Sequence, residues 1–322
     1  MNGPILRGQI DTYLEEAKDA IKNLIGLKIF PEYGSPLQSG QYLKLRIALA
    51  ELLNADVARH APGAAFVRYT RTFEYDNFDC IEYGIEELVP YVQADETGRY
   101  GLDQQSKAAE LAMRRMLLAH EIRVQSQVFN STNFTTLSPS VAYTTANGPA
   151  GNQTVNVVLD ILTARRALEI QGVDPFDLTL VIASPLWDYV KQTTILQNYL
   201  RGNRPTDSDK LMKPADFAAL FDLKDVLVGR ASYNTAGKNV VPAVLSYIWP
   251  NTYWALVQII GGDFSAGGVG RTIFWEKYGN LFTSEEYPEY QRDSAVVRVK
   301  GHMIEKVVNL TAGCVTTTSA NF

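Results

Sequence analysis

The sequence predicts an α+β protein organised around one long helix. The first observation is residues 102–129, which contain no Gly or Pro and consist mainly of strong helix formers such as Ala, Leu, Met, Gln and Arg. The second is the stretch 64–90, in which aromatic residues of high strand propensity are interleaved with charges. The third is a succession of helix-like and strand-like patterns over residues 155–260. Together they favour a helical spine to which β-rich elements and a compact α/β unit attach.

The spine has local signals of its own. Asp103 is expected to be the N-cap, with its charge on the favourable side of the helix dipole. Asp103–Lys107 and Glu110–Arg114 are i,i+4 pairs with the acid on the N-terminal side, which is the more stabilising order. At 1.5 Å per residue, roughly 27 residues form a rod of about 40 Å. This is more than twice the usual helix length.

Bulk properties limit the classes of protein. A chain of 322 residues can form one or two domains, and its net charge of −5 gives no basic tail for nucleic acid. Cys80 and Cys314 are expected to be isolated buried thiols in a reducing compartment. No apolar run is long enough for a membrane span, and acidic residues stand where a signal peptide would be apolar. We therefore expect a protein made in a cytoplasm, without membrane contact.

The N-terminal region predicts an amphipathic helix over residues 9–25. Its apolar stripe consists of Ile10, Leu14, Ala17, Ile21, Leu24 and Ile25. The helix either packs on its own domain or docks on a neighbouring chain, and the sequence leaves both possibilities open. Beyond it, residues 41–60 begin like a strand and end like a short helix.

The charged β-rich stretch 64–90 predicts an extended two-stranded ribbon. Its mixture of Phe and Tyr with Arg, Asp and Glu does not suit a central strand that is buried on both faces. An isolated ribbon is marginal in water, so we expect a partner chain to stabilise it.

Residues after the spine alternate between helix and strand patterns. Helices are expected at 155–171, from Pro185 to Leu200, and at 214–222; strands are expected at 177–184, 224–234, twice within 245–260, and twice within 295–318.

Catalytic and metal-binding motifs are incomplete. His60, His120 and His302 have no second ligand at a metal spacing, and His120 begins a zinc-protease-like pattern that lacks its second His. Ser184 does not lie in a G-x-S-x-G elbow. The glycine-rich run 261–270 has neither the Lys of a P-loop nor the helix that follows a dinucleotide-binding turn. We therefore expect no catalytic residue, cofactor or metal, and interpret His120 as a packing or helix-surface residue.

Several tracts, in this order, resemble the major capsid proteins of tailed phages with the Hong Kong 97-type fold. They are LKIFPEYGSP (27–36), RHAPGAAF (59–66), FDCIEYGIEELVPYVQAD (78–95), LTLVIASPLWDYVKQ (178–192), FAALFDLKDVLVGRASYNTA (217–236), IWPNTYWALV (248–257) and GRTIFWE (270–276). The resemblance extends over about residues 25–320. It implies a non-enzymatic shell protein that assembles into hexamers and pentamers of an icosahedral virion capsid around double-stranded DNA, without sequence-specific contacts.

The resemblance also implies a division of the chain. Residues 1–30 would be an N-terminal arm, 31–98 the extended loop and β ribbon, 99–154 with 286–322 a peripheral domain, and 155–285 an axial domain. Scaffold, portal and decoration proteins would be partners, and assembly would take place in the cytoplasm of a bacterial host. Residues expected at subunit interfaces are Arg68, Arg71, Glu74, Asp76, Glu86, Glu87, Ile21 and Leu24.

The sequence departs from some members of that family in one respect. Those members link their shells by an isopeptide bond between an extended-loop Lys and an Asn of another subunit. Between Pro31 and Asp95 the only lysine here is Lys44, so we expect no such bond. Two alternatives to a viral capsid protein stay open at this point: an encapsulin-like nanocompartment shell, and a soluble α/β enzyme with a cleft near 184–190 or 261–270.

Overall fold

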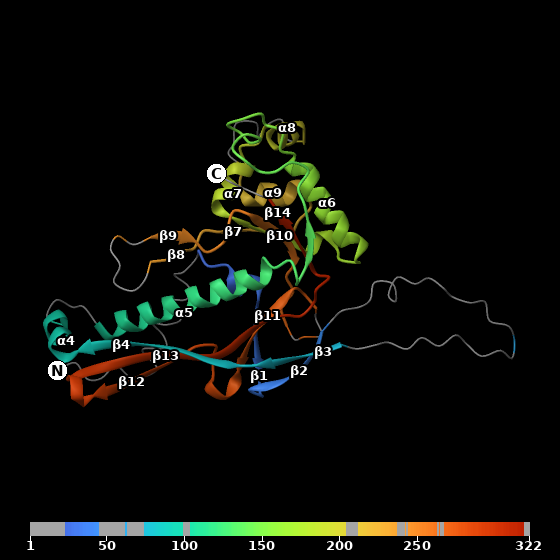
Figure 1. Cartoon of the computed structure of the whole chain (residues 1–322). Coiled ribbons are helices and arrows are strands. Elements are labelled where there is room, and N and C mark those ends of the chain that lie inside the picture. Colours follow the sequence, from blue (N-terminus) through green and yellow to red (C-terminus); the bar gives the residue numbers. More distant parts are fainter. Residues whose placement is uncertain are drawn as a thin grey trace.

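The computed structural model describes residues 23–44, 62, 74–98, 104–203, 212–236, 242, 244–262, 264 and 267–318. Figure 1 shows two lobes. An elongated spine lobe carries the long helix α5 (Gln104–Val128) over a sheet, and an α/β lobe stands on one side of it. The long helix is confirmed in its predicted position, because its composition specifies it locally.

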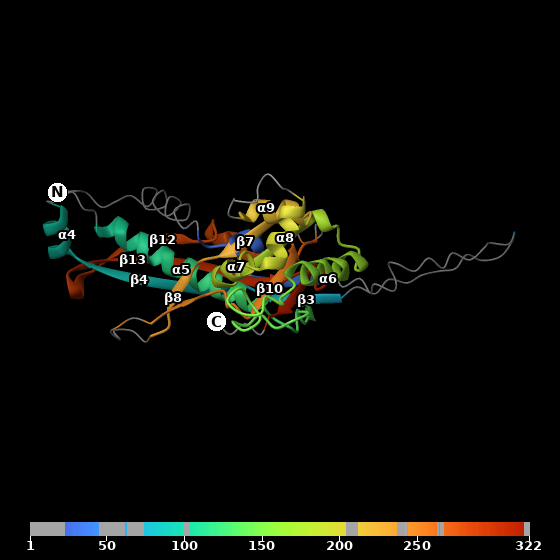
Figure 2. The ribbon, with the colours of Figure 1, turned by 90° about the horizontal axis from the view of Figure 1, so that it is seen from above.

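The sheet of the spine lobe is built around β13 (Ser294–Val307), the longest strand among those described. β13 pairs antiparallel with β12 (Thr283–Glu289), β4 (Ile81–Pro90) and β11 (Gly270–Trp275), and β1 (Glu32–Ser35) adds to β11 in parallel. Figure 2 shows α5 lying along this sheet. Strands from three distant parts of the sequence, residues 32–35, 81–90 and 270–307, therefore meet under the spine.

The sheet of the α/β lobe has the order β5-β14-β10-β6-β7 and is mixed parallel and antiparallel. Its strands are β5 (Thr135–Leu137), β14 (Gly313–Thr317), β10 (Tyr253–Gln258), β6 (Leu178–Ala183) and β7 (Asp225–Gly229). Every residue of β6 is buried, as its uninterrupted apolar run predicts. The helices of this lobe are α6 (Val157–Ile170), α7 (Ser184–Val190), α8 (Thr194–Asn203) and α9 (Pro214–Leu220).

Local signals explain where these helices begin. The Asn156 side chain accepts from the backbone N–H of Leu159 and caps α6, and Pro185 occupies the first turn of α7. The predicted single helix from Pro185 to Leu200 is wrong, because the structure has two helices with a break at residues 191–193. There the Thr193 hydroxyl donates to the carbonyl of Val190 at the end of α7.

The remaining elements are short. A ribbon of β2 (Ser39–Lys44) and β3 (Glu74–Asp79) lies at one end of the spine lobe, and a second ribbon of β8 (Ser232–Asn234) and β9 (Leu245–Tyr247) projects from the α/β lobe (Figure 1). α2 (Gly26–Ile29), α4 (Tyr91–Gly98), and the 3-10 turns η1 (Pro175–Asp177), η4 (Glu276–Tyr278) and η5 (Tyr290–Arg292) complete the described elements.

The spine belongs to two hydrophobic cores. Its first half places Ala109, Ala112, Met113 and Leu117 against Val297 and neighbouring residues of the spine sheet. Its last turn contributes Val124 and Val128 to the much larger core of the α/β lobe. The helix therefore connects both lobes through buried contacts.

Two predicted divisions of the chain need correction. The C-terminal strands do not form one pair: β13 lies in the spine sheet, whereas β14 lies in the α/β sheet. Asn309 builds the turn between them, since its side chain accepts from both the N–H and the hydroxyl of Thr311. Conversely, β11 lies before residue 286 and β12 crosses it, yet both belong to the spine sheet, because their partner is β13. The boundary at 285/286 therefore does not coincide with the division between the sheets.

The predicted free ribbon over 64–90 also needs correction in its described part. β3 does pair in a two-stranded ribbon, but β4 pairs with β13 over ten positions of the chain's own main sheet. Tyr83, Ile85 and Val89 alternate toward the spine core, which is the pattern of a strand with one buried face. Charged residues on both faces of β4 form ion pairs within the subunit, Glu86 with Arg298 on one face and Glu87 with Arg115 on the other.

Candidate assembly surfaces

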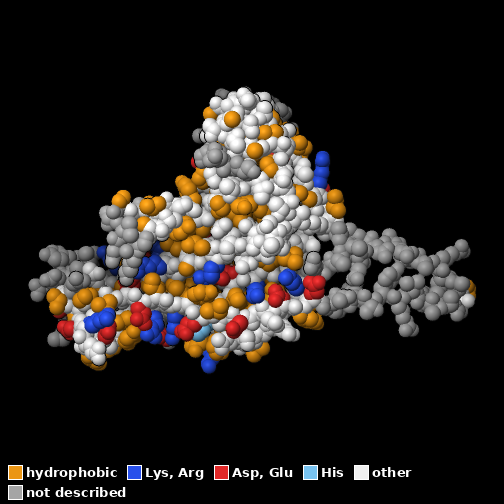
Figure 3. Space-filling model, in the orientation of Figure 1, with side chains coloured by type: hydrophobic (Ala, Val, Ile, Leu, Met, Phe, Trp, Pro, Cys, Tyr) orange, Lys and Arg blue, Asp and Glu red, His pale blue; other side chains and the backbone are white. Residues whose placement is uncertain are grey.

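Glu86 lies on the face of β4 that points away from the spine. It stands directly opposite Arg298 of β13, and its carboxylate accepts from Arg298 Nε at 2.6 Å and from the Tyr287 hydroxyl at 3.1 Å. The hydrogen bond from Arg298 lowers the pKa of Glu86. Glu285 extends the group, with Lys300 Nζ at 2.6 Å from its Oε1. Figure 3 shows the mixed acidic and basic side chains of the spine lobe.

Glu87, the next residue, lies on the opposite face and forms an ion pair with Arg115 of the spine. Tyr83 on the same face of β4 lies under the Arg123 guanidinium, 4.0 Å from ring centroid to Cζ. Both predicted interface residues on β4, Glu86 and Glu87, thus have partners within their own subunit. Their contribution to contacts with a neighbour stays a prediction.

Asp76 lies in β3 of the β2–β3 ribbon, two residues after Glu74 and opposite Tyr42 of β2. It accepts from the Tyr42 hydroxyl at 3.1 Å and lies 3.8 Å from Lys44 Nζ. Burial alone would raise the pKa of Asp76, but the Asn77 N–H and the charges of Lys306 and Lys44 outweigh it, so that the pKa is lowered. Burial and the charge of Asp76 raise the pKa of Tyr42. The base of the ribbon is therefore fixed to the spine lobe by a charged hydrogen-bond network.

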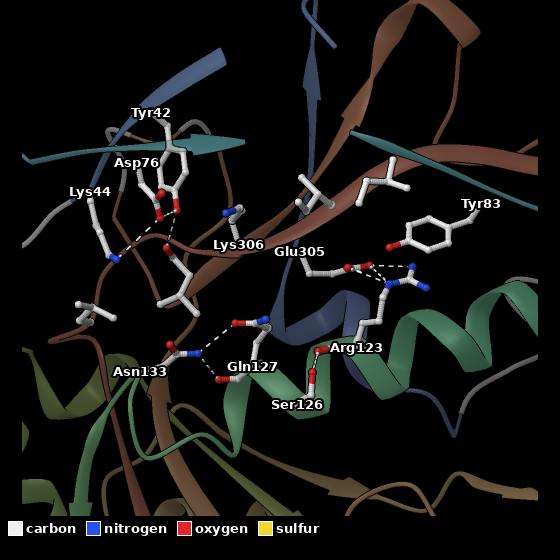
Figure 4. Close-up of a pocket in the computed structure, with 14 residues that line it drawn as sticks. Tyr42, Lys44, Asp76, Tyr83, Arg123, Ser126, Gln127, Asn133, Glu305 and Lys306 are labelled. Atoms are coloured by element: carbon white, nitrogen blue, oxygen red, sulfur yellow. Dashed lines mark hydrogen bonds and ion pairs between the residues drawn. The ribbon is translucent and has the colours of Figure 1, made fainter. Parts of the chain in front are cut away.

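A pocket of about 310 Å³ opens beside this network, between the ribbon, the end of α5 and β13 (Figure 4). On its far wall, Arg123 donates from Nε to both carboxylate oxygens of Glu305, at 3.0 and 2.9 Å. Asn133 joins the end of the spine by donating to the backbone and side-chain oxygens of Gln127. Four of the five charges that line the pocket are paired, Lys44 with Asp76 and Arg123 with Glu305, so its walls carry little net charge.

Glu121 is the most deeply buried carboxylate of the spine, with 1% of its surface exposed. Its Oε1 accepts from the backbone N–H of Ile25 at 3.0 Å and from Trp249 Nε1 at 2.6 Å, and its Oε2 accepts from the N–H of Gly26 at 2.6 Å. Burial raises the pKa of Glu121, and the three donors only partly oppose this. One side chain thus joins the spine, the N-terminal segment and the α/β lobe.

The other predicted interface residues are placed unequally. Leu24 is half-buried and packs between the two large cores. Ile21, Arg68 and Arg71 lie outside the described residues.

His120 is a packing residue: it is 1% exposed and lies 2.9 Å from the Thr272 hydroxyl. Sequence reasoning missed Glu121, Arg298 and Glu305, because their partners are remote in sequence and no local pattern marks them.

The described residues carry no metal cluster and no membrane-spanning helix. No cluster of three or more His, Cys, Asp and Glu side chains there could hold a metal ion. In the same part of the chain, no helix is both long and apolar enough to cross a membrane. Cys80 and Cys314 are free and buried, as predicted, and burial raises the pKa of their thiols to about 11 and about 12.

The fold relates the chain to known structures, although its sequence matches no protein-family profile and no curated protein. It is similar to a phage-related protein from Bordetella bronchiseptica RB50, with a TM-score of 0.70, 16% identity, and coverage of 96% of this chain and 97% of that one. It is also similar to a virus-like particle protein from Pyrococcus furiosus, with a TM-score of 0.54, 12% identity, and coverage of 97% of this chain and 100% of that one. The similarity to the capsid protein of cyanophage P-SCSP1u has a TM-score of 0.56 and 9% identity, and it covers 90% of this chain and 85% of that one.

These similarities cover nearly the whole chain and both lobes. The capsid of the myovirus XM1 is a further example, with a TM-score of 0.53 and 91% of each chain covered. The chain therefore has the Hong Kong 97-type fold of phage capsid proteins, as the sequence resemblance predicts.

Proposed function

We propose that this chain is the major capsid protein of a tailed phage. The observation that supports the proposal best is the match of the complete two-lobed architecture, spine included, to phage capsid proteins over at least 90% of this chain. In this proposal the chain has a structural role and catalyses no reaction. It assembles with copies of itself into hexamers and pentamers that close into an icosahedral shell.

The charge distribution suits such a role. A net charge of −5 allows a wall to enclose double-stranded DNA without binding phosphate tightly, whereas a strongly basic lining would bind it. Contacts with DNA would be independent of base sequence. Portal and scaffold proteins, and in some phages decoration proteins, would complete the particle, which would assemble in the cytoplasm of a bacterial host.

The proposed contacts between subunits use the residues that the sequence predicts for interfaces. They comprise Ile21, Leu24, Arg68, Arg71, Glu74, Asp76, Glu86 and Glu87. Asp76, Glu86 and Glu87 already have intramolecular partners, so we expect them to orient the edge of the subunit as well as contact a neighbour. Each standard interface buries on the order of 1,600 Å², and closure of a shell multiplies modest contacts into strong retention.

A nanocompartment shell is the second candidate. The similarity to the Pyrococcus furiosus virus-like particle, which covers 97% of this chain, favours it. The two candidates differ in cargo, since a phage capsid encloses a genome and a nanocompartment encloses protein.

Electron microscopy of the purified protein, followed by nuclease treatment of the particles, tests the proposal. Closed shells or hexameric and pentameric rings are expected, with nuclease-protected double-stranded DNA inside shells purified from phage-producing cells. Shells that contain an enzyme and no DNA would favour the nanocompartment. A stable monomer of 35.8 kDa would contradict both shell functions.

A further inference from the structure

The β8–β9 ribbon exposes an apolar face. Leu245 and Tyr247 are 71% and 49% exposed and lie two residues apart, so they share one face of β9. Their cross-strand partners Asn234 and Ser232 lie on the same face and are small and polar. No residue of β9 is buried. The ribbon therefore presents two large apolar side chains to solvent without a core beneath them.

The ribbon is nevertheless held in a defined position. Its base is fixed where Ile248 donates to the carbonyl of Ala231 at 2.9 Å, next to the fully buried Trp249. Farther out, the Asn234 side chain accepts from the N–H of Val244 at 3.1 Å. A two-stranded ribbon gains little stability alone in water, so an ordered one that exposes Leu and Tyr is typical of a contact surface.

A second set of exposed apolar side chains lies on α6 and the η1 turn that follows it. Figure 1 shows α6 on the flank of the lobe opposite the β8–β9 ribbon. Leu159 and Ile170 are 45% and 67% exposed and lie eleven residues apart, which places them on one stripe of α6, with exposed Thr163 and Arg166 between them. Phe176 of η1, 65% exposed, extends this surface. Figure 2 gives the same relation from above, with the ribbon and α6 on different sides of the lobe.

We propose that these two surfaces bind each other between neighbouring copies of this chain, so that the ribbon face of one subunit packs on the α6–η1 face of the next. The inference rests on the proposed shell function and names the contact that would join α/β lobes around a capsomer. Two different complementary surfaces on opposite flanks form a head-to-tail contact, and such a contact generates a ring when the rotation closes.

Charge supports a second copy as the occupant. Exposed Arg230 lies at the base of the ribbon. On the other surface Asp174 and Asp177 flank Phe176 at the η1 end, whereas exposed Arg166 lies on the α6 part. Head-to-tail packing brings the ribbon side of one copy to the α6–η1 side of the next, which allows Arg230 to approach these carboxylates. Packing of ribbon on ribbon would instead place two Arg230 side chains on the same seam, where like charges repel.

Cysteine cross-linking tests the contact. Leu245→Cys and Phe176→Cys are combined in one chain, and assembled particles are treated with a short bis-maleimide and boiled in denaturant. Because the two positions lie on opposite flanks of a lobe, a bond between them joins different subunits. We expect a ladder that extends beyond the dimer for the double variant and no ladder for either single variant. The native Cys80 and Cys314 are buried and serve as the unreactive background.

The outcomes separate the contact from the proposed function. If the unmodified protein forms no shells or rings, the shell function itself fails. If shells form but the double variant gives no ladder, only the head-to-tail contact is refuted; dimers from Leu245→Cys alone would refute it in favour of ribbon-on-ribbon packing. Phe176→Cys combined with Tyr290→Cys, at an 88% exposed site on the spine lobe, is the matched control, and an equal ladder there would also refute the contact.

A second measurement does not depend on cross-linking. Leu245→Asp should reduce the yield of shells at least tenfold while leaving the subunit folded, whereas Leu37→Asp, at a 61% exposed position in another part of the chain, should not. Normal assembly of Leu245→Asp would overturn the inference.

Discussion

The indole Nε1–H of Trp249 donates to Glu121 Oε1 at 2.6 Å, which links the α/β lobe to the spine through a buried bond. The same carboxylate accepts two backbone N–H groups of the N-terminal segment. Three donors converge on this carboxylate. All three are buried, so water cannot replace the carboxylate as their acceptor. This side chain therefore adds a polar junction to the apolar contacts that position the three segments.

Glu121→Gln tests this junction. The amide nitrogen of Gln cannot accept, so at least one of the three donors loses its partner inside the protein. An unsatisfied buried donor costs about 1–3 kcal/mol, and we expect the free energy of unfolding to fall by that amount. Urea unfolding followed by tryptophan fluorescence, at one fixed protein concentration, measures it. Glu110→Gln, on the exposed side of the same helix, is the control and should change stability by less than about 0.5 kcal/mol.

The same residue gives a pH dependence of defined sign. Burial raises the pKa of Glu121 above its usual value of 4.5, so the unfolded chain loses this proton at a lower pH than the folded one does. Between those two pKa values the unfolded state binds fewer protons, and this group's contribution to stability falls as pH rises. Urea midpoints from about pH 4 to about pH 7 should therefore show a decline in the native protein that Glu121→Gln lacks. A difference between the two proteins that grows with pH would contradict the assigned sign.

The case of Glu121 also shows what sequence could and could not predict. Composition located the spine, and Pro185 located the start of α7, because both signals act within a few residues. Glu110 and Glu121 look alike in the sequence, and only distant partners decide that one is exposed and the other buried. For the same reason the two strands within 245–260 were predictable, but not that β9 pairs with β8 while β10 joins β6 and β14.

The cross-strand pair Glu86–Arg298 predicts the result of a charge swap. Glu86→Arg and Arg298→Glu each place like charges opposite one another, and we expect each to destabilise the subunit modestly. The double variant should recover a coupling free energy of about 0.2–1 kcal/mol, the range for exposed pairs. A double-mutant cycle from urea unfolding measures it. If Glu86 acts chiefly at a subunit boundary, assembly will be lost in the single variant and the swap will not restore it.

Leu117→Pro should break the spine. Leu117 is 3% exposed in the core between α5 and the sheet, and proline at mid-helix removes a backbone hydrogen bond and clashes with the preceding turn. We expect a cost of about 3 kcal/mol or more and the loss of soluble assembly. Leu117→Met retains the side-chain volume and should cost less than about 1.5 kcal/mol. Normal particles from the proline variant, seen by electron microscopy, would refute the role of α5 as the connection between the lobes.

Mature particles should contain no covalent mesh. Lys44 is the only lysine between Pro31 and Asp95, and its ammonium lies 3.8 Å from the carboxylate of Asp76 at the base of the β2–β3 ribbon. The amine is thus directed at a carboxylate of its own subunit, and we expect it to form no amide with an Asn of a neighbour. Boiling in denaturant and reductant should give one band at 35.8 kDa, while a chemically cross-linked sample on the same gel gives a ladder. A ladder from untreated particles would contradict this prediction and require a lysine elsewhere in the chain. A single band means that the shell depends on noncovalent interfaces, many modest contacts that closure of the shell combines into strong retention.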